Sequence, residues 1–219
     1  MFRDLISKSP HCAHSQFDFS IDRAFQKSKE FDKISESQTQ VHTMIPNGFV
    51  LHESRCGSTL VANSLAAMNP EQTRVYSESA PFLAALTICG EGFTRCSIEE
   101  TADILKKVVF LMGRTDDHRE KHMFFKIQSA GTKFISVLKV AFPETPWIFV
   151  YRDPVEVMMS HLGIPDIEKA NCLRSKHHPA PDFLQMISAK GVSLSSLSYE
   201  EFCAVHLVSV CKRTLKAYF

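Results

Sequence analysis

Residues that could bind an oxyanion lie close together in the stretch FVLHESRCGSTLVANSL, which spans residues 49–65. An apolar run precedes them and a helix-like run follows, so the free N–H groups of the helix start would point into the turn. Gly57 would let the backbone approach a ligand closely, and Ser58 and Thr59 would add hydroxyl donors. Arg55 would add a planar guanidinium that suits a tetrahedral oxyanion. The stretch therefore predicts a phosphate-like ligand.

The same turn differs from the Walker A loop of nucleoside triphosphatases. That pattern requires a lysine directly after its second glycine, whereas Ser58 follows Gly57 here. The alternative interpretation is an ordinary turn between a strand and a helix, with a serine that caps the helix.

A second stretch, WIFVYRDPVEVMMS at residues 147–160, also joins a strand-like run to a helix-like run. Arg152 ends the strand-like run, and Ser160 follows eight residues later, about two helical turns into the next element. Both side chains could reach a second phosphate if the chain folds back over one ligand. In the alternative interpretation Arg152 pairs with Asp153 or Glu156, and Ser160 is simply a small helix residue.

The elements that must position these residues follow one another in a regular alternation. Short apolar runs predict strands and longer periodic runs predict helices, which indicates βαβ units and a mostly parallel sheet. After an N-terminal leader and peripheral helix in residues 1–45, we expect one α/β domain over residues 46–219, with a turn at 46–48. Residues 163–197 are expected to form an irregular acceptor loop or lid. The predicted strands are 49–53, 73–77, 122–128 and 146–152, and the predicted helices are 20–34, 58–68, 80–89, 97–114, 131–142, 154–162 and 198–219.

Composition limits the partners and the compartment that we expect. With 25 basic and 24 acidic residues the net charge is +1, so no global field would attract nucleic acid or a membrane. The sequence shows no signal peptide and no run of the ~20 apolar residues that a membrane span needs, and we expect a cytoplasmic protein. The odd cysteine count without a C-x-x-C pair predicts mostly reduced thiols. The seven cysteines are Cys12, Cys56, Cys89, Cys96, Cys172, Cys203 and Cys211.

Taken together, the two stretches resemble the sulfotransferase superfamily that uses 3′-phosphoadenosine 5′-phosphosulfate. SRCGSTL is similar to the 5′-phosphosulfate loop of that family, in the arginine form of tyrosylprotein and bacterial sulfotransferases. YRDPVEVMMS is similar to its 3′-phosphate element, R-[ND]-P-x-[DE]-x-x-x-S. The resemblance covers residues 47–162, and it implies a three-layer α/β fold of the P-loop nucleoside triphosphatase type.

The resemblance also implies ligands and roles. The donor would be 3′-phosphoadenosine 5′-phosphosulfate, no metal would be required, and an unidentified hydroxyl or amine acceptor would attack the sulfur in line. Arg55 would stabilise the charge that develops during transfer. The residues that would hold the 5′-phosphosulfate are Arg55, Cys56, Gly57, Ser58 and Thr59, and those for the 3′-phosphate are Arg152 and Ser160.

A general base for the acceptor proton is less clear in the sequence. Gln128 stands where the cytosolic branch of the family has a histidine, and glutamine is not a base. Other branches use a glutamate shortly after the first helix, and Glu78 at the exit of the second predicted strand is our candidate; otherwise it caps the 80–89 helix. Lys126 is either a second cation of the site or a residue at its edge. We expect His52 to be a core histidine and assign no role to His161.

Two further function classes stay open at this stage. One is a kinase-like phosphotransferase, although the loop lysine and an obvious carboxylate pair for Mg²⁺ are missing. The other is a non-catalytic nucleotide-binding or scaffold protein. Family members continue into another strand, which is not visible before Phe219, so we expect a C-terminally truncated domain, weaker nucleotide binding or a degenerate relative.

Overall fold

The computed structural model describes residues 20–35, 41–90, 93–177 and 179–218. The chain divides into two compact units, Met1–Thr39 and Gln40–Phe219. The described part of the first unit is helix α3 (Ile21–Ser35), which confirms the helix predicted at 20–34. All other elements of the described residues belong to the second unit, which holds both stretches predicted to bind anions.

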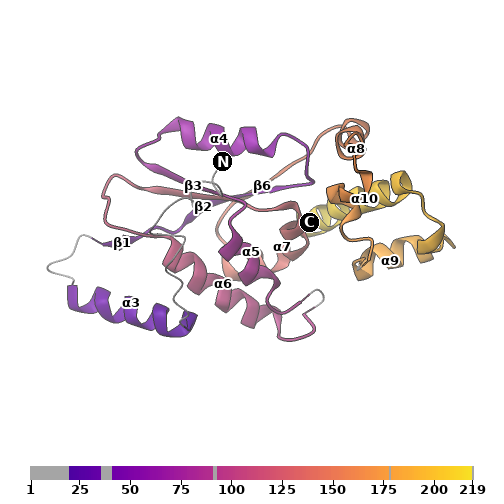
Figure 1. Cartoon of the computed structure of the whole chain (residues 1–219). Coiled ribbons are helices and arrows are strands. Elements are labelled where there is room, and N and C mark those ends of the chain that lie inside the picture. Colours follow the sequence, from indigo (N-terminus) through magenta and orange to yellow (C-terminus); the bar gives the residue numbers. More distant parts are fainter. Residues whose placement is uncertain (1–19, 36–40, 91–92, 178, 219) are drawn as a thin grey trace. The chain divides into compact units, whose positions relative to one another are not determined.

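A four-stranded parallel sheet forms the centre of the second unit (Figure 1). Its strands lie in the order β3 (Thr73–Ser77), β5 (His122–Lys126), β2 (Pro46–His52) and β6 (Trp147–Val150). All three strand pairings are parallel, which confirms the predicted mostly parallel sheet. The turn predicted at 46–48 is wrong, because β2 already begins at Pro46 and passes through a register shift before Gly48.

Helices cover both faces of this sheet and make three layers (Figure 1). Helix α4 (Ser58–Met68) lies on one face, whereas α5 (Ala80–Thr87), α6 (Ile98–Met112) and α7 (Ile135–Ala141) lie on the other. Helix α6 begins with the reciprocal capping box that its sequence predicts, in which Ser97 and Glu100 satisfy each other's backbone N–H groups. The α/β prediction is therefore confirmed.

The main hydrophobic core lies between the sheet and the three-helix layer. Phe49 of β2 and Phe125 of β5 are 2% and 1% exposed, and the rings of Phe125 and Phe82 of α5 lie 4.7 Å apart. Each such side chain contributes about 1.5–3 kcal/mol when it leaves water. This core fixes the sheet, and with it the positions of the loops at the strand ends.

The segment after β6 is more ordered than its sequence predicts. Helix α8 (Pro154–Leu162) is followed by α9 (Pro181–Ser188) and α10 (Tyr199–Tyr218), and α9 contradicts the expectation of an irregular loop over 163–197. The tilted rings of Phe183 and Phe202 lie 4.6 Å apart in a second core between α9 and α10. The short 3₁₀ turns of the unit are η1 (Ser129–Phe134), η2 (Ile167–Lys169), η3 (Asn171–Leu173) and η4 (Leu194–Ser196).

Two disulfides correct the expectation of mostly reduced thiols. Cys89 pairs with Cys96 between α5 and α6, and Cys172 of η3 pairs with Cys203 of α10; the Cα atoms of each pair lie 5.1 Å apart. The partners are 7 and 31 residues apart in the sequence, so a count of cysteines and a search for C-x-x-C could not reveal them. Among the described residues, the remaining free thiols are Cys56 and Cys211.

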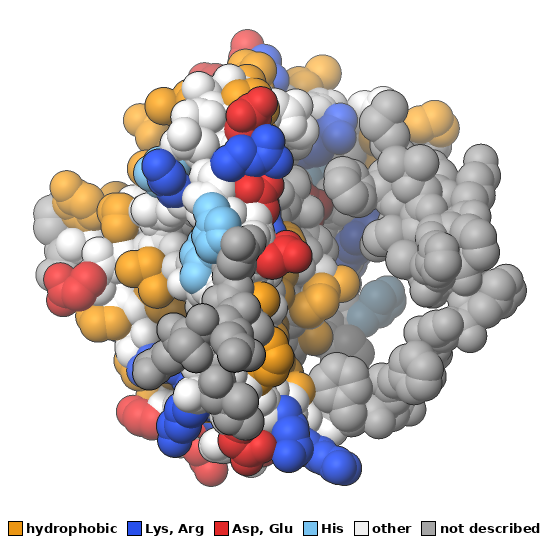
Figure 2. Space-filling model, turned by 90° about the vertical axis from the view of Figure 1, so that its left-hand side faces the viewer, with side chains coloured by type: hydrophobic (Ala, Val, Ile, Leu, Met, Phe, Trp, Pro, Cys, Tyr) orange, Lys and Arg blue, Asp and Glu red, His pale blue; other side chains and the backbone are white. Residues whose placement is uncertain are grey.

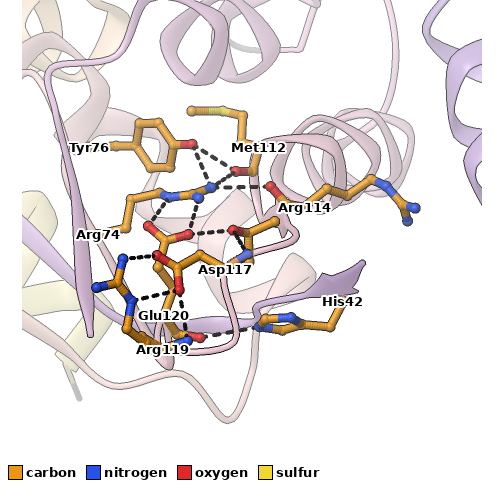
Figure 3. Close-up of polar contacts among 9 residues, drawn as sticks. His42, Arg74, Tyr76, Met112, Arg114, Asp117, Arg119 and Glu120 are labelled. Atoms are coloured by element: carbon orange, nitrogen blue, oxygen red, sulfur yellow. Dashed lines mark hydrogen bonds and ion pairs between the residues drawn. The ribbon is translucent and has the colours of Figure 1, made fainter. Parts of the chain in front are cut away.

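A polar cluster around Arg74 of β3 has a structural role (Figure 3). Arg74 forms a two-point ion pair with Glu120, which also accepts a 2.6 Å hydrogen bond from Thr115. Arg74 and Tyr76 both donate to the carbonyl of Met112, at 3.0 and 2.7 Å. Burial alone would raise the pKa of Glu120, but the hydrogen bonds from Arg74 and Thr115 hold that pKa below its usual value. The cluster ties β3 to the end of α6.

Near this cluster lies the small antiparallel sheet of β1 (His42–Thr43) and β4 (Arg114–Thr115), which the sequence analysis did not predict. The face of the molecule drawn in Figure 2 mixes acidic, basic and histidine side chains. Such a mixture agrees with the near-zero net charge of the chain. In the part of the chain that the structure describes, every helix is too short or too polar to cross a membrane.

Candidate functional site

The candidate site lies where the carboxyl ends of the parallel strands meet. The loop from Glu53 to Gly57 leaves the central strand β2 with an unusual backbone: φ is +81° at Ser54, +55° at Arg55 and +89° at Gly57. Two non-glycine residues in the left-handed region cost free energy, and such conformations are concentrated at ligand sites. Gly57 is the N-cap of α4, and nothing lies within 4 Å of the place where its Cβ would be, so no neighbouring atom blocks a ligand at this point of the helix start.

A cavity of ≈ 370 Å³ opens beside this loop. Five of the seven residues predicted to bind the donor line it, together with both members of an ion pair from the neighbouring strands β3 and β5. The lining residues are His52, Ser54, Arg55, Gly57, Ser58, Thr59, Glu78, Lys126, Ser160 and Asn171.

The two predicted motifs meet at this cavity. Arg55 Nε donates a 2.8 Å hydrogen bond to Ser160 Oγ, across 105 residues of sequence. Ser160 lies on α8, so this bond joins the loop before α4 to the second motif. A guanidinium oriented by a hydroxyl partner is well placed to bind an oxyanion with its remaining N–H groups.

Arg152, the other residue of the second motif, lies outside the lining of the cavity. Its Nε donates to Glu156 Oε2, as the alternative interpretation of the sequence expected. Its backbone N–H donates at 2.6 Å to Glu53, whose side chain is buried between the two motifs. Burial raises the pKa of Glu53, although the Arg152 N–H lowers it in part. The assignment of Arg152 to a second phosphate stays a prediction.

Cys56 contributes its backbone to the loop, but its side chain points into the core. Its Sγ donates to the carbonyl of Val150 at 3.2 Å and packs against Val157 and Leu207. Burial raises the pKa of this thiol. A role of Cys56 in ligand binding therefore depends on its backbone N–H.

Glu78 lies at the exit of β3 and faces the cavity. Its φ is +55°, and its carboxylate forms an ion pair with the ammonium of Lys126 at the end of β5. Lys126 is only 3% exposed, so the interpretation of this lysine as an edge residue is wrong. The interpretation of Glu78 as a helix cap is wrong as well, because Ser79 occupies the N-cap position of α5. The backbone carbonyl of Glu78 accepts a 3.3 Å hydrogen bond from Gln128.

His52 completes this cluster at the end of β2. It is 4% exposed, and burial together with the charge of Lys126 lowers its pKa to about 4, so the ring is neutral at physiological pH. Because Nδ1 accepts the Ser54 N–H at 3.0 Å, the ring proton belongs on Nε2. Nε2 lies 3.8 Å from Glu78 Oε1 and makes no hydrogen bond within the described part of the chain. The expected core histidine is therefore buried but lines the cavity.

A second cavity of ≈ 220 Å³ adjoins the first. The two share four lining residues, and one of these is Glu78, which therefore faces both spaces. The shared residues are His52, Ser54, Glu78 and Asn171. The remaining wall comes from the start of η1, the segment between η3 and α9, and the helices α9 and α10. Its residues are Gln128, Ser129, Ala130, Lys133, Arg174, Ser175, Ala180, Phe183, His206, Ser209, Val210 and Arg213.

Sequence analysis did not identify most of this second wall. Asn171 and Arg174 lie in a segment without a recognisable motif, and His206 and Arg213 lie on a helix for which the sequence analysis predicted no role in a site. No local signal marks them. His161 lies next to Ser160 but lines neither cavity; it is 3% exposed, and burial and the charge of Arg55 lower its pKa.

Comparisons of the chain with family models, with curated proteins and with solved structures found no match.

Proposed function

We propose that the protein transfers a sulfuryl group from 3′-phosphoadenosine 5′-phosphosulfate to an acceptor. The observation that carries this proposal is the meeting of the two motifs through the bond from Arg55 Nε to Ser160 Oγ, beside the glycine turn that opens α4. The central position of β2 in the order β3-β5-β2-β6 supports the resemblance to P-loop proteins. Ligands of open α/β sheets bind outside the carboxyl ends of such central strands.

In the proposed reaction the phosphosulfate occupies the cavity beside residues 55–59. The acceptor oxygen forms a bond to sulfur while the bond from sulfur to the phosphate oxygen breaks, and adenosine 3′,5′-bisphosphate leaves. Arg55 and the N–H groups at the start of α4 stabilise the negative charge on the leaving oxygen. Positioning supplies much of the rest of the acceleration, as in phosphoryl transfer.

Glu78 is the proposed general base. Its carboxylate lies between the two cavities, so an acceptor in the second cavity can pass its proton to Glu78 while it faces the donor in the first. Lys126 holds the carboxylate through their ion pair, and the Nε2–H of His52 faces the same carboxylate. The three side chains come from three neighbouring strands, which gives the base a rigid support.

The two disulfides change the cellular compartment that we propose for the protein. Disulfides persist in oxidising compartments and are rare in the cytosol. The pairs Cys89–Cys96 and Cys172–Cys203 therefore favour an oxidising compartment over the cytoplasmic one that the sequence analysis expected.

Calorimetric titration of the 219-residue chain tests the proposal. Adenosine 3′,5′-bisphosphate should bind more tightly than 5′-AMP or ATP, and Arg55→Ala should abolish this binding. Arg95→Ala is the matched control, because Arg95 is exposed and lines neither cavity. Equal affinities for the three nucleotides, or an unchanged affinity in Arg55→Ala, would refute the donor assignment.

A non-catalytic nucleotide-binding protein is the second candidate. The observation that favours it is the ion pair between Arg152 and Glu156, because Arg152 is the residue predicted to bind the second phosphate. For this candidate the bisphosphate binds, but no acceptor receives labelled sulfate from the donor, and Glu78→Gln leaves all measured properties unchanged. Transfer to any acceptor would exclude it.

A further inference from the structure

The second cavity concentrates positive charge. Three cations line it, one each from η1, the segment after η3 and α10: Lys133, Arg174 and Arg213. Among the described lining residues the only carboxylate is Glu78, which already pairs with Lys126. In a chain with a net charge of +1, such a wall is a local feature and not a result of composition.

The surroundings of these cations make an anion favourable. Arg213 forms a two-point ion pair with Asp182, a residue outside the cavity lining, and this pair orients the guanidinium. Burial and then the nearby charge of Arg213 lower the pKa of Lys133 to about 8, so an oxyanion beside that ammonium would stabilise its charged form. Among the described residues, no carboxylate pairs with the guanidinium of Arg174.

A buried histidine lies beside Glu78 in the wall that both cavities share. His52 Nε2 is buried and makes no hydrogen bond within the described residues, although it belongs to the wall that both cavities share. Buried polar atoms are nearly always paired, and each exception needs an explanation. The nearest acceptor is Glu78 Oε1 at 3.8 Å, so a small shift of that carboxylate would pair Nε2 and leave the other carboxylate oxygen for a ligand hydroxyl.

The rest of the wall limits the size and shape of the ligand. Phe183 and Val210 provide apolar surface, with Ala130 and Ala180 beside them. A cavity of about 150 Å³ is large enough for benzene. At ≈ 220 Å³ the second cavity has room for one ring with a substituent.

We propose that the second cavity binds the acceptor, and that this acceptor is a single-ring hydroxyl compound that carries a carboxylate or another oxyanion. Its hydroxyl lies toward Glu78 and its anion toward Lys133 and Arg174. The description of this ligand as an acceptor rests on the proposed sulfuryl transfer, whereas the preference of the cavity for anions does not.

Matched pairs of probes test the preference by titration of the whole chain. One pair is 4-hydroxybenzoate and 4-hydroxybenzamide, and the other is methyl glucuronide and methyl glucoside. Within each pair the ring and the hydroxyl groups attached to it stay constant, and the carboxylate is replaced by a neutral amide or a neutral hydroxymethyl group. We expect the acid of at least one pair to bind tenfold or more tightly than its neutral partner, and the pair that responds identifies an aromatic or a sugar ring.

Substitutions of two cations in the cavity wall test whether they cause the preference for the acid probe. Arg174→Gln and Lys133→Gln should each reduce the preference for the acid at least threefold, whereas Lys190→Gln, an exposed residue that lines neither cavity, should not. Arg174 is exposed in a loop, so its replacement should leave the fold intact, which a thermal melt checks. Equal binding of acid and neutral probe in both pairs, or an unchanged preference in both variants, overturns the proposal.

Parallel titration with adenosine 3′,5′-bisphosphate separates this proposal from the donor assignment. If the bisphosphate binds and neither acid is preferred, the anionic acceptor is refuted and sulfuryl transfer stands. If an acid is preferred and the bisphosphate does not bind, the anion cavity stands and the transfer reaction is refuted. Arg174→Gln should leave bisphosphate affinity unchanged, because Arg174 does not line the first cavity; a parallel loss would assign that cation to the nucleotide and overturn the acceptor proposal.

Discussion

Reduction of the Cys172–Cys203 disulfide should lower the free energy of unfolding more than reduction of Cys89–Cys96. The partners are 31 residues apart in the first pair and 7 in the second. In the chain-entropy model a cross-link stabilises by restricting the unfolded chain, and the effect grows with the length of the closed loop. These separations correspond to about 3.7 and about 2.4 kcal/mol at 25 °C.

Urea unfolding with and without reductant measures the stability that one disulfide contributes when the other is removed by substitution. The double variant Cys89→Ala and Cys96→Ala keeps only the long loop, and Cys172→Ala with Cys203→Ala keeps only the short one. Each variant is compared with itself, so loss of buried side-chain volume cancels. Reductant should lower the unfolding midpoint of the first variant by about 1–2 M urea, and that of the second by less.

Thiol labelling checks the premise of this prediction. Mass spectrometry of the unfolded, unreduced chain should find three alkylated cysteines, because the two disulfides of the described residues hold four of the seven, and all seven after reduction. Seven alkylated cysteines before reduction, or equal losses of stability in the two variants, would refute the reasoning.

Four further predictions concern single side chains. Glu78→Gln should keep bisphosphate affinity and lower turnover by about 10²–10⁴-fold, the usual contribution of a general base; unchanged transfer of labelled sulfate would remove Glu78 from the mechanism. Arg152→Ala should weaken the binding of adenosine 3′,5′-bisphosphate far more than that of 5′-AMP in calorimetry. Equal losses of affinity for the two nucleotides would contradict the assignment of Arg152 to the 3′-phosphate. The folded state raises the pKa of Glu53, so this group stabilises the fold below pH ~4.5, and that stabilisation is lost as the pH rises through the raised pKa. Glu53→Gln should therefore make the free energy of urea unfolding less dependent on pH above pH ~4.5. The same pH dependence in the variant and the unchanged protein would contradict this prediction. For Glu120 the pH dependence of stability has the opposite sign, because a lowered pKa stabilises the fold above the unfolded pKa and this stabilisation is lost on acidification. Glu120→Gln should lower the free energy of unfolding by about 1–3 kcal/mol at pH 7, and an unchanged value would show that the pair with Arg74 is dispensable.

Much of the fold was predictable because the signals are local. The four strands of the main sheet and the helices that flank it follow from apolar runs, helical periodicity and caps such as Ser97 with Glu100. Short elements were missed: β1 and β4 contain two residues each, too few for any periodicity. Helix α9 was missed because its segment is rich in proline and serine, although Pro181 begins the helix in a favourable position.

The candidate site was predictable only in its separate parts. The glycine turn, the arginine before it and the second Arg-x₇-Ser element are visible in the sequence, because the residues of each motif are close neighbours along the chain. Sequence reasoning left open whether Arg152 would bind a ligand or Glu156, since both contacts are within its reach. The structure places it against Glu156.

The sequence by itself determined the α/β alternation and the glycine turn before α4, because each depends on residues within one or two turns of a helix or one strand. Tertiary structure alone decided which distant side chains meet. Arg55 reaches Ser160 and Glu78 reaches Lys126 because the parallel strands end at the same edge of the sheet. The pairing of Cys172 with Cys203 and the cationic wall of the second cavity follow from the packing of η3 and α9 against α10, which no short-range pattern specifies.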